Sequence, residues 1–114
     1  MLTLLEKLPS EFEKKFKDYI KMTELTKVSL LLNTNAALVI TNKQILIAKK
    51  KFLLGIRVTE LPQEDLLDLL YNEDTYELVF KTKEKDIAIT VDNAHVAILE
   101  KLKMLKEISL KRRN

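Results

Sequence analysis

Side chains that could carry out catalysis are few in this chain. His95 is the sole histidine, so a histidine-based metal cluster cannot form. It stands between Ala94 and Val96 at the start of an expected helix, and this position favours a structural role. The absence of cysteine excludes thiol chemistry, disulfides and cysteine-ligated metals.

A cluster of carboxylates, Glu64, Asp65 and Asp68, is a second candidate site. Carboxylates can bind hard cations, but the spacing here matches no calcium-binding loop. We therefore expect a solvated acidic surface. The single glycine leaves no glycine-rich loop that could hold phosphates. Together these patterns predict a protein that is not an enzyme, with no catalytic residue, metal site or cofactor.

The chemistry that remains is binding. Lys49, Lys50 and Lys51 stand directly before Phe52 and two leucines, at the end of an expected strand. The lysines could solvate the strand end while Phe52 or Leu54 folds inward. They could instead contact a protein partner. A third possibility is shallow insertion into an anionic membrane, with about 1 kcal/mol from each lysine.

Charge is segregated along the sequence. The net charge of +3 combines +5 over residues 1–54, −6 over residues 55–92 and +4 over residues 93–114. Nucleic-acid-binding domains usually carry a strongly basic face rich in arginine, whereas this chain has three arginines and an acidic middle. Binding to nucleic acid is therefore not expected, whereas docking to a protein partner fits such a dipolar surface.

Periodicity predicts a helix near each end of the chain. Capping boxes at residues 3–6 and 10–13 predict a short helical turn and then a helix over about 10–23. A second helix is predicted from Asp92 or Asn93 to about Lys111, and its apolar face includes Ile98, Leu102, Leu105 and Ser109.

Between the helices, β-branched runs separated by turn residues predict six or seven short antiparallel strands. These runs are KVSLLLNTN, AALVITNKQILIAKK, IRVTELP and TYELVFKTKEKDIAITV. The stretch QEDLLDLLYN fits either a helical turn or a buried strand. The order of elements predicts an α+β fold that is mainly β.

Several of these stretches resemble the bacterial pleckstrin-homology-like domains, from about residue 28 to residue 108. ALVITNKQILIAKK, GIRVTELPQEDLLDLLYN, YELVFKT, KDIAITV and NAHVAILEKLKML carry the resemblance. It implies a strongly bent antiparallel sheet of about seven strands, nearly closed into a barrel and capped by the C-terminal helix. Residues 1–24 would then form an N-terminal helical extension to a domain over residues 25–114.

The resemblance also implies that the turns after the first, third and sixth strands gather at one open end. Eukaryotic members bind phosphoinositide head groups there through a basic motif on the first two strands, which residues 33–35 lack. The other two turns would supply a basic rim. The candidate ligand-binding residues are Lys49, Lys50, Lys51, Phe52, Lys81, Lys83 and Lys85.

The N-terminal segment is strongly apolar, and its candidate interface residues are Leu4, Leu5, Leu8, Phe12 and Phe16. An isolated helix cannot leave so much apolar surface in water. The segment could pack across its own sheet, or it could bury this surface against another copy or a partner.

The function expected from these observations is a non-enzymatic protein-binding or scaffolding module that self-associates, and bacterial relatives of this fold are thought of in this way. The alternative is a peripheral membrane domain that binds anionic lipid through its lysine-rich turns. A further alternative is a small phage-borne inhibitor of a host protein, since the composition suggests a bacterial or phage gene. Without a signal peptide or spanning segment, we expect a cytoplasmic protein.

Overall fold

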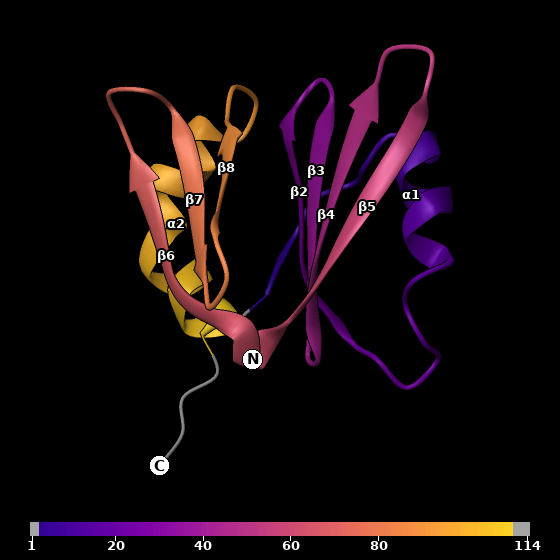
Figure 1. The fold of residues 1–114 in the computed structure, drawn as a ribbon, viewed down its shortest axis with the longest axis horizontal. Helices are drawn as coiled ribbons and strands as arrows, with labels where there is room; N and C mark the ends of the chain where they lie inside the picture. Colours follow the sequence, from indigo (N-terminus) through magenta and orange to yellow (C-terminus); the bar gives the residue numbers. More distant parts are fainter. Residues whose placement is uncertain (1–2, 111–114) are drawn as a thin grey trace.

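The computed structural model describes residues 3–110 as two β-sheets and two helices (Figure 1). The five-stranded sheet has the order β1-β2-β3-β4-β5 and the three-stranded sheet the order β6-β7-β8. The strands are β1 (Leu4–Leu5), β2 (Thr26–Asn33), β3 (Ala36–Thr41), β4 (Gln44–Lys51), β5 (Gly55–Pro62), β6 (Leu66–Asn72), β7 (Glu77–Thr82) and β8 (Asp86–Thr90). Helix α1 (Ser10–Lys17) precedes β2, the 3-10 turn η1 (Gln63–Asp65) links β5 to β6, and α2 (His95–Ser109) follows β8.

Short turns connect the antiparallel strands, and polar side chains hold these turns. The Asn33 side chain accepts a hydrogen bond from the Asn35 N–H at 2.7 Å in the β2–β3 turn. In the β3–β4 turn, the Thr41 hydroxyl accepts from the N–H groups of Lys43 and Gln44, each at 3.1 Å. The predicted strands and hairpins are therefore confirmed over this region.

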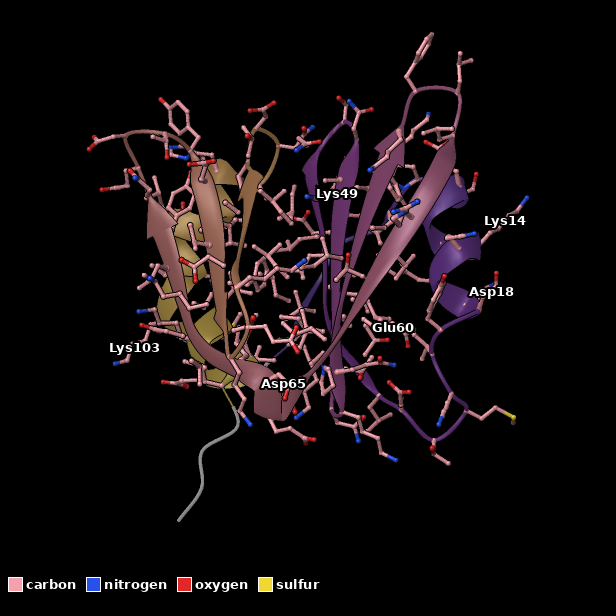
Figure 2. The ribbon with its side chains drawn as sticks, viewed as in Figure 1. Lys14, Asp18, Lys49, Glu60, Asp65 and Lys103 are labelled. Carbon is pink, nitrogen blue, oxygen red and sulfur yellow. The ribbon has the colours of Figure 1, made fainter. Side chains whose placement is uncertain are left out.

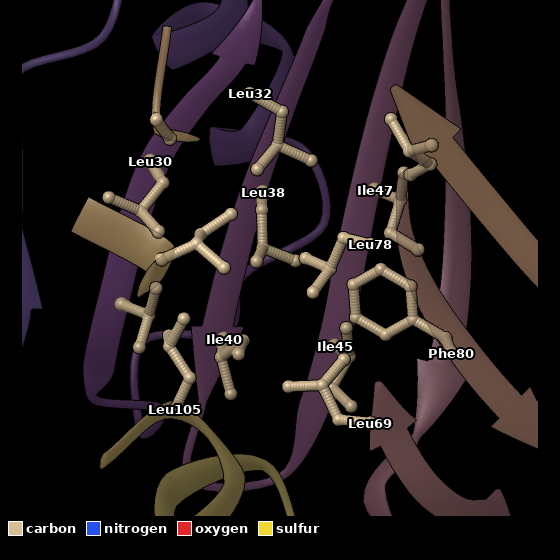
Figure 3. Close-up of a cluster of buried hydrophobic side chains, with 14 of the residues drawn as sticks. Leu30, Leu32, Leu38, Ile40, Ile45, Ile47, Leu69, Leu78, Phe80 and Leu105 are labelled. Atoms are coloured by element: carbon tan, nitrogen blue, oxygen red, sulfur yellow. The ribbon is translucent and has the colours of Figure 1, made fainter. Parts of the chain in front are cut away.

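Apolar side chains form two separate clusters. The larger one lies between the sheets and includes the buried face of α2 (Figure 3), with Leu30, Leu38, Ile45, Leu69, Phe80, Ile98 and Leu105 among its members. The smaller one lies between α1 and the outer face of the five-stranded sheet. It contains Leu8, Phe12, Phe16, Ala37, Val39, Leu46 and Ala48.

The start of the chain differs from the prediction. Residues 3–6 form no helical turn: Leu4 and Leu5 make strand β1, which pairs in parallel with β2. The Glu6 N–H donates to the Ser29 carbonyl at 2.9 Å, a long-range bond that the local capping pattern could not reveal. Helix α1 ends at Lys17 instead of Thr23, and its first N–H groups bond to the Pro9 carbonyl instead of a side-chain cap.

The two sheets do not close into a barrel, so the prediction of a nearly closed barrel is wrong. They meet at one corner through η1. At the other corner the N–H groups of Asp92 and Asn93 donate to the Leu32 carbonyl at 2.8 and 3.1 Å.

The ambiguous stretch QEDLLDLLYN contains both predicted elements, since η1 leads directly into β6. Helix α2 covers the core with Ile98, Leu105 and Ser109, as predicted.

No helix among residues 3–110 is both long and apolar enough to cross a lipid bilayer.

Candidate functional site

The loop between β4 and β5 carries three adjacent large apolar side chains in water. Phe52, Leu53 and Leu54 are 88%, 86% and 79% exposed. The loop is closed by the pairing of Lys51 with Gly55 and by a hydrogen bond from the Leu54 N–H to the Lys51 carbonyl at 3.0 Å. Side chains of this loop extend beyond the end of the sheet (Figure 2). We call residues 52–54 the apolar tip.

The sequence allowed three roles for the run from Lys49 to Leu54. The exposure of the tip shows that the first of them, in which Phe52 or Leu54 folds inward, is wrong. The backbone of the tip is also unusual, because Leu53 has a φ of 64° and Gly55 one of 78°. A left-handed conformation suits glycine but strains a branched residue such as leucine. A strained and exposed leucine in a surface loop is an observation that favours a functional role for the loop.

The three lysines before the tip divide between the two faces of β4. Ile45 and Ile47 point into the main core, so strand alternation directs Lys49 and Lys51 to that same inner face. There they border a groove of about 440 Å³ between the β2–β3 turn and β8 (Lys49 is labelled in Figure 2). Lys50 lies on the outer face, where its ammonium pairs with Glu11 of α1 at 3.1 Å.

Arg57 adds a further positive charge beside the tip. It lies directly opposite Lys49 in the β4–β5 register and is exposed. Side chains directly opposite each other on antiparallel strands share a face of the sheet. Lys49, Lys51 and Arg57 therefore form a basic patch on the inner side of the tip.

The second lysine cluster does not join this patch. Lys83 lies beside η1, where its N–H donates to the Asp65 carbonyl at 3.2 Å and its ammonium lies 3.9 Å from the Asp65 carboxylate. Asp65 follows Pro62, which ends β5 at the opposite end from Gly55. An eight-residue strand spans about 25 Å. Figure 1 likewise places the β7–β8 turn at the lower end and the β4–β5 loop at the upper end.

The other members of that cluster are also engaged away from the tip. Lys81 pairs with Asp86 at 3.4 Å, and the Lys85 N–H donates to the Thr82 hydroxyl at 3.1 Å. The expectation that both lysine-rich turns gather at one rim is therefore wrong. Successive strands alternate in direction, so the turn after β4 and the turn after β7 lie at opposite ends of the molecule (Figure 1).

The candidate interface residues of the N-terminal segment lie mostly inside the chain. Leu8, Phe12 and Phe16 are buried in the cluster beneath α1, Leu4 packs against the main core, and Leu5 is exposed. The structure thus shows the first of the two alternatives, in which the segment packs across its own sheet. Contact of this segment with another copy stays a prediction.

His95 is held by two tyrosines. Its Nδ1 atom is hydrogen-bonded to the Tyr71 hydroxyl, and the Tyr76 ring packs edge-on against it with 4.8 Å between ring centroids. Burial, together with the nearby Tyr76 and Glu73, raises the pKa of Tyr71 above its usual value. Tyr76 itself has a φ of 56°. This arrangement joins the β6–β7 loop to the first turn of α2.

Two of the three acidic residues singled out in the sequence are paired with lysines, and the third, Glu64, is exposed. Asp65 lies near Lys83, and Asp68 lies 4.0 Å from Lys106 and also accepts from the Leu69 N–H at 2.8 Å. Within residues 3–110, no three histidine, aspartate or glutamate side chains gather in a way that could hold a metal ion.

The sequence analysis missed the outer face of the three-stranded sheet. The register places Leu70 opposite Val79, and Val79 opposite Ala88, in one outward row. A shallow groove of about 620 Å³ lies over Leu70 and Val79 of this row. Its charged lining consists of Glu73, Asp74, Asp86 and Lys81. The alternation of outward residues along β6 and β7 is the available signal in the sequence, but QEDLLDLLYN fits a helical turn as well as a strand.

Comparison with known proteins supports the fold. No protein-family model matches the chain, and no curated protein matches it significantly. A solved structure of a DUF1696 family protein with a pleckstrin-homology domain, from Shewanella loihica PV-4, superposes with a TM-score of 0.66 at 11% sequence identity. The match covers 92% of this chain and all of the other. The chain therefore has the fold of a bacterial pleckstrin-homology-like domain, as the resemblance implied.

Proposed function

We propose that this chain is a non-enzymatic binding module that docks on protein surfaces through its apolar tip, and that it self-associates in the cytoplasm. One observation carries the proposal: Phe52, Leu53 and Leu54 project together into water next to a basic patch. Adjacent exposed apolar residues of this size are typical of interaction surfaces. The proposal moves the expected contact from α1, whose apolar face is occupied, to the β4–β5 loop.

The energetics of the tip suit a weak, reversible contact. Full burial of one Phe or Leu side chain contributes about 1.5–3 kcal/mol, so the tip would supply roughly 5–9 kcal/mol. Association opposes this with a loss of translational and rotational freedom of about 4 kcal/mol or more. The tip therefore needs additional polar contacts at its rim, and Lys49, Lys51 and Arg57 are placed to make them.

The experiment compares the native chain with Phe52→Ser/Leu53→Ser/Leu54→Ser by sedimentation velocity from micromolar to near-millimolar concentration. We expect concentration-dependent association of the native chain and a monomer for the variant. Met22→Ser is the matched control, because Met22 is fully exposed in the segment between α1 and β2. A native chain that stays monomeric throughout, or equal association of both chains, would overturn the proposal.

An anionic membrane is the second candidate, and the lysines beside the tip favour it. Phe and Leu inserted among lipid head groups, with Lys49 and Lys51 against anionic lipid, would give binding that weakens as salt rises. Co-sedimentation with phosphatidylserine-containing vesicles, at low and near-physiological salt, tests this candidate. Binding that disappears in Lys49→Glu/Lys51→Glu would support it, and no binding by the native chain at low salt would exclude it.

A further inference from the structure

The groove on the outer face of the three-stranded sheet is complementary to the apolar tip. Its floor is the apolar row of Leu70 and Val79, and Leu70 is 36% exposed. Neither apolar cluster of the described chain includes a residue of this row. The floor is thus apolar, open and large enough to accept a protruding side chain.

The rim of the groove is acidic. Glu73 and Asp74 lie in the β6–β7 loop at its edge, and Asp86 borders it from β8. Lys81 is the single basic residue of the lining, and the Asp86 carboxylate already pairs with it at 3.4 Å. Within the described part of the chain, neither Glu73 nor Asp74 forms an ion pair, so these two carboxylates give the groove a negative rim.

The basic patch beside the tip has the opposite charge. Lys49, Lys51 and Arg57 are exposed, and none of the three pairs with a carboxylate of residues 3–110, whereas Lys50 is held by Glu11. An apolar tip with a positive rim thus matches an apolar floor with a negative rim. Complementary potentials of this kind favour encounter and fix the register of a complex.

We infer that the apolar tip of one copy docks in the acidic groove of a second copy. This inference rests on the proposed function and names the surface that receives the tip. The tip and the groove are different surfaces. Two copies that exchange tip and groove reciprocally form a two-fold dimer, whereas a copy that offers its tip to one neighbour and its groove to another forms part of a closed ring or an open chain.

Charge reversal tests the inference on both sides of the contact. Lys49→Glu/Lys51→Glu makes the rim of the tip acidic, and Glu73→Lys/Asp74→Lys makes the groove basic. We expect each variant alone to associate at least tenfold more weakly than the native chain in sedimentation velocity. An equimolar mixture should recover association, because an acidic tip then meets a basic groove and a basic tip meets an acidic groove.

Matched controls reverse charges elsewhere on the surface. Lys101→Glu/Lys103→Glu on α2 and Glu60→Lys/Glu64→Lys near η1 alter the same numbers of exposed residues outside both surfaces. We expect both controls to associate like the native chain. Thermal unfolding of every variant would verify that the fold is retained.

The outcomes separate this inference from the proposed function. If the serine variant of the tip loses association while Glu73→Lys/Asp74→Lys keeps it, the tip docks on another surface and the inference is overturned alone. If the native chain does not associate, both fail. Failure of the mixture to recover association would also overturn the docking of tip in groove.

Discussion

The two sheets differ in how their outer faces meet water: the outer face of the five-stranded sheet is covered by α1, whereas that of the three-stranded sheet is exposed. On the five-stranded sheet, Ala37, Val39, Leu46 and Ala48 point outward and are buried beneath α1. On the three-stranded sheet, the outward rows are polar or charged except for the row of Leu70, Val79 and Ala88. A sheet face that is apolar in several rows must be covered, whereas a face with one apolar row can remain in water.

The difference is visible in the residue pattern of single strands. All six residues of β3 are buried, as expected for a strand packed on both faces. In β7, buried Leu78 and Phe80 alternate with partly exposed residues. The covered face thus stabilises the fold, and the bare face is free to contact another molecule.

The largest expected effect on stability comes from removing a large buried side chain between α1 and the five-stranded sheet. Phe12 is fully buried between α1 and the sheet, so Phe12→Ala should lower the free energy of unfolding by about 3–5 kcal/mol through lost burial and a cavity. Urea denaturation would measure this change. Leu70→Ala is the matched control on the bare face and should lower stability by less than about 1 kcal/mol. Equal losses of unfolding free energy in the two variants would contradict the view that the covered face contributes more to stability than the exposed face of the three-stranded sheet.

A second prediction concerns the segment that leads from α1 back into the sheet. The Glu24 carboxylate accepts hydrogen bonds from the Thr41 hydroxyl at 2.7 Å, from the Gln44 amide at 3.2 Å and from the Lys21 N–H at 3.2 Å. Burial acts to raise the pKa of Glu24, but these hydrogen bonds and the charge of Lys43 outweigh it. The pKa is therefore lowered from its usual value of 4.5.

A lowered pKa means that the ionised carboxylate stabilises the folded state above pH 4.5, and that this stabilisation is lost as pH falls below that value. We expect Glu24→Gln to lower the free energy of unfolding by about 1–2 kcal/mol at pH 7. The difference from the native chain should shrink towards pH 3. Urea unfolding of both chains across this range measures it, and a difference that does not depend on pH would contradict this account.

The sequence predicted those parts of the fold that depend on neighbouring residues. Residues 36–51 combine two β-branched runs with a turn at Asn42, so the β3–β4 hairpin followed from local pattern alone. The pairing of β1 with β2 could not be foreseen, because it joins residues more than 20 positions apart. The end of α1 at Lys17 was missed because Tyr19 and Ile20 continue the apolar spacing beyond the helix.

The candidate site was predicted in its residues but not in its geometry. The run from Lys49 to Leu54 was singled out from its composition. Composition alone does not determine whether the Phe52 side chain points into the core or into water, because this depends on how the two sheets are arranged around the core. The separation of Lys83 from Lys49 has another cause: successive strands alternate in direction, so the turns after β4 and β7 lie at opposite ends.

The strained tip offers a third prediction, with a smaller effect. Leu53→Gly should release about 1–2 kcal/mol of left-handed strain while adding about 0.5–1 kcal/mol of unfolded-state entropy. We therefore expect stability to remain equal or to rise by up to about 1.5 kcal/mol, while association weakens. Gly55→Ala is the matched control: its Cβ would meet no atom within 4 Å, so its φ of 78° alone should reduce stability by about 1 kcal/mol. A large loss of stability in Leu53→Gly would show that Leu53 supports the fold.

The smallest expected effect concerns the ion pair between Lys50 and Glu11, which joins the covered face to the edge of the tip. Both side chains are nearly half exposed, and exposed ion pairs contribute about 0–1 kcal/mol. Lys50→Ala should therefore change the free energy of unfolding by less than about 0.5 kcal/mol in urea denaturation. It should also weaken self-association less than Lys49→Ala, because Lys50 points to the α1 side of β4 and Lys49 to the inner side. If Lys50→Ala weakened association more than Lys49→Ala, the docking surface would lie on the covered side of the sheet, next to α1.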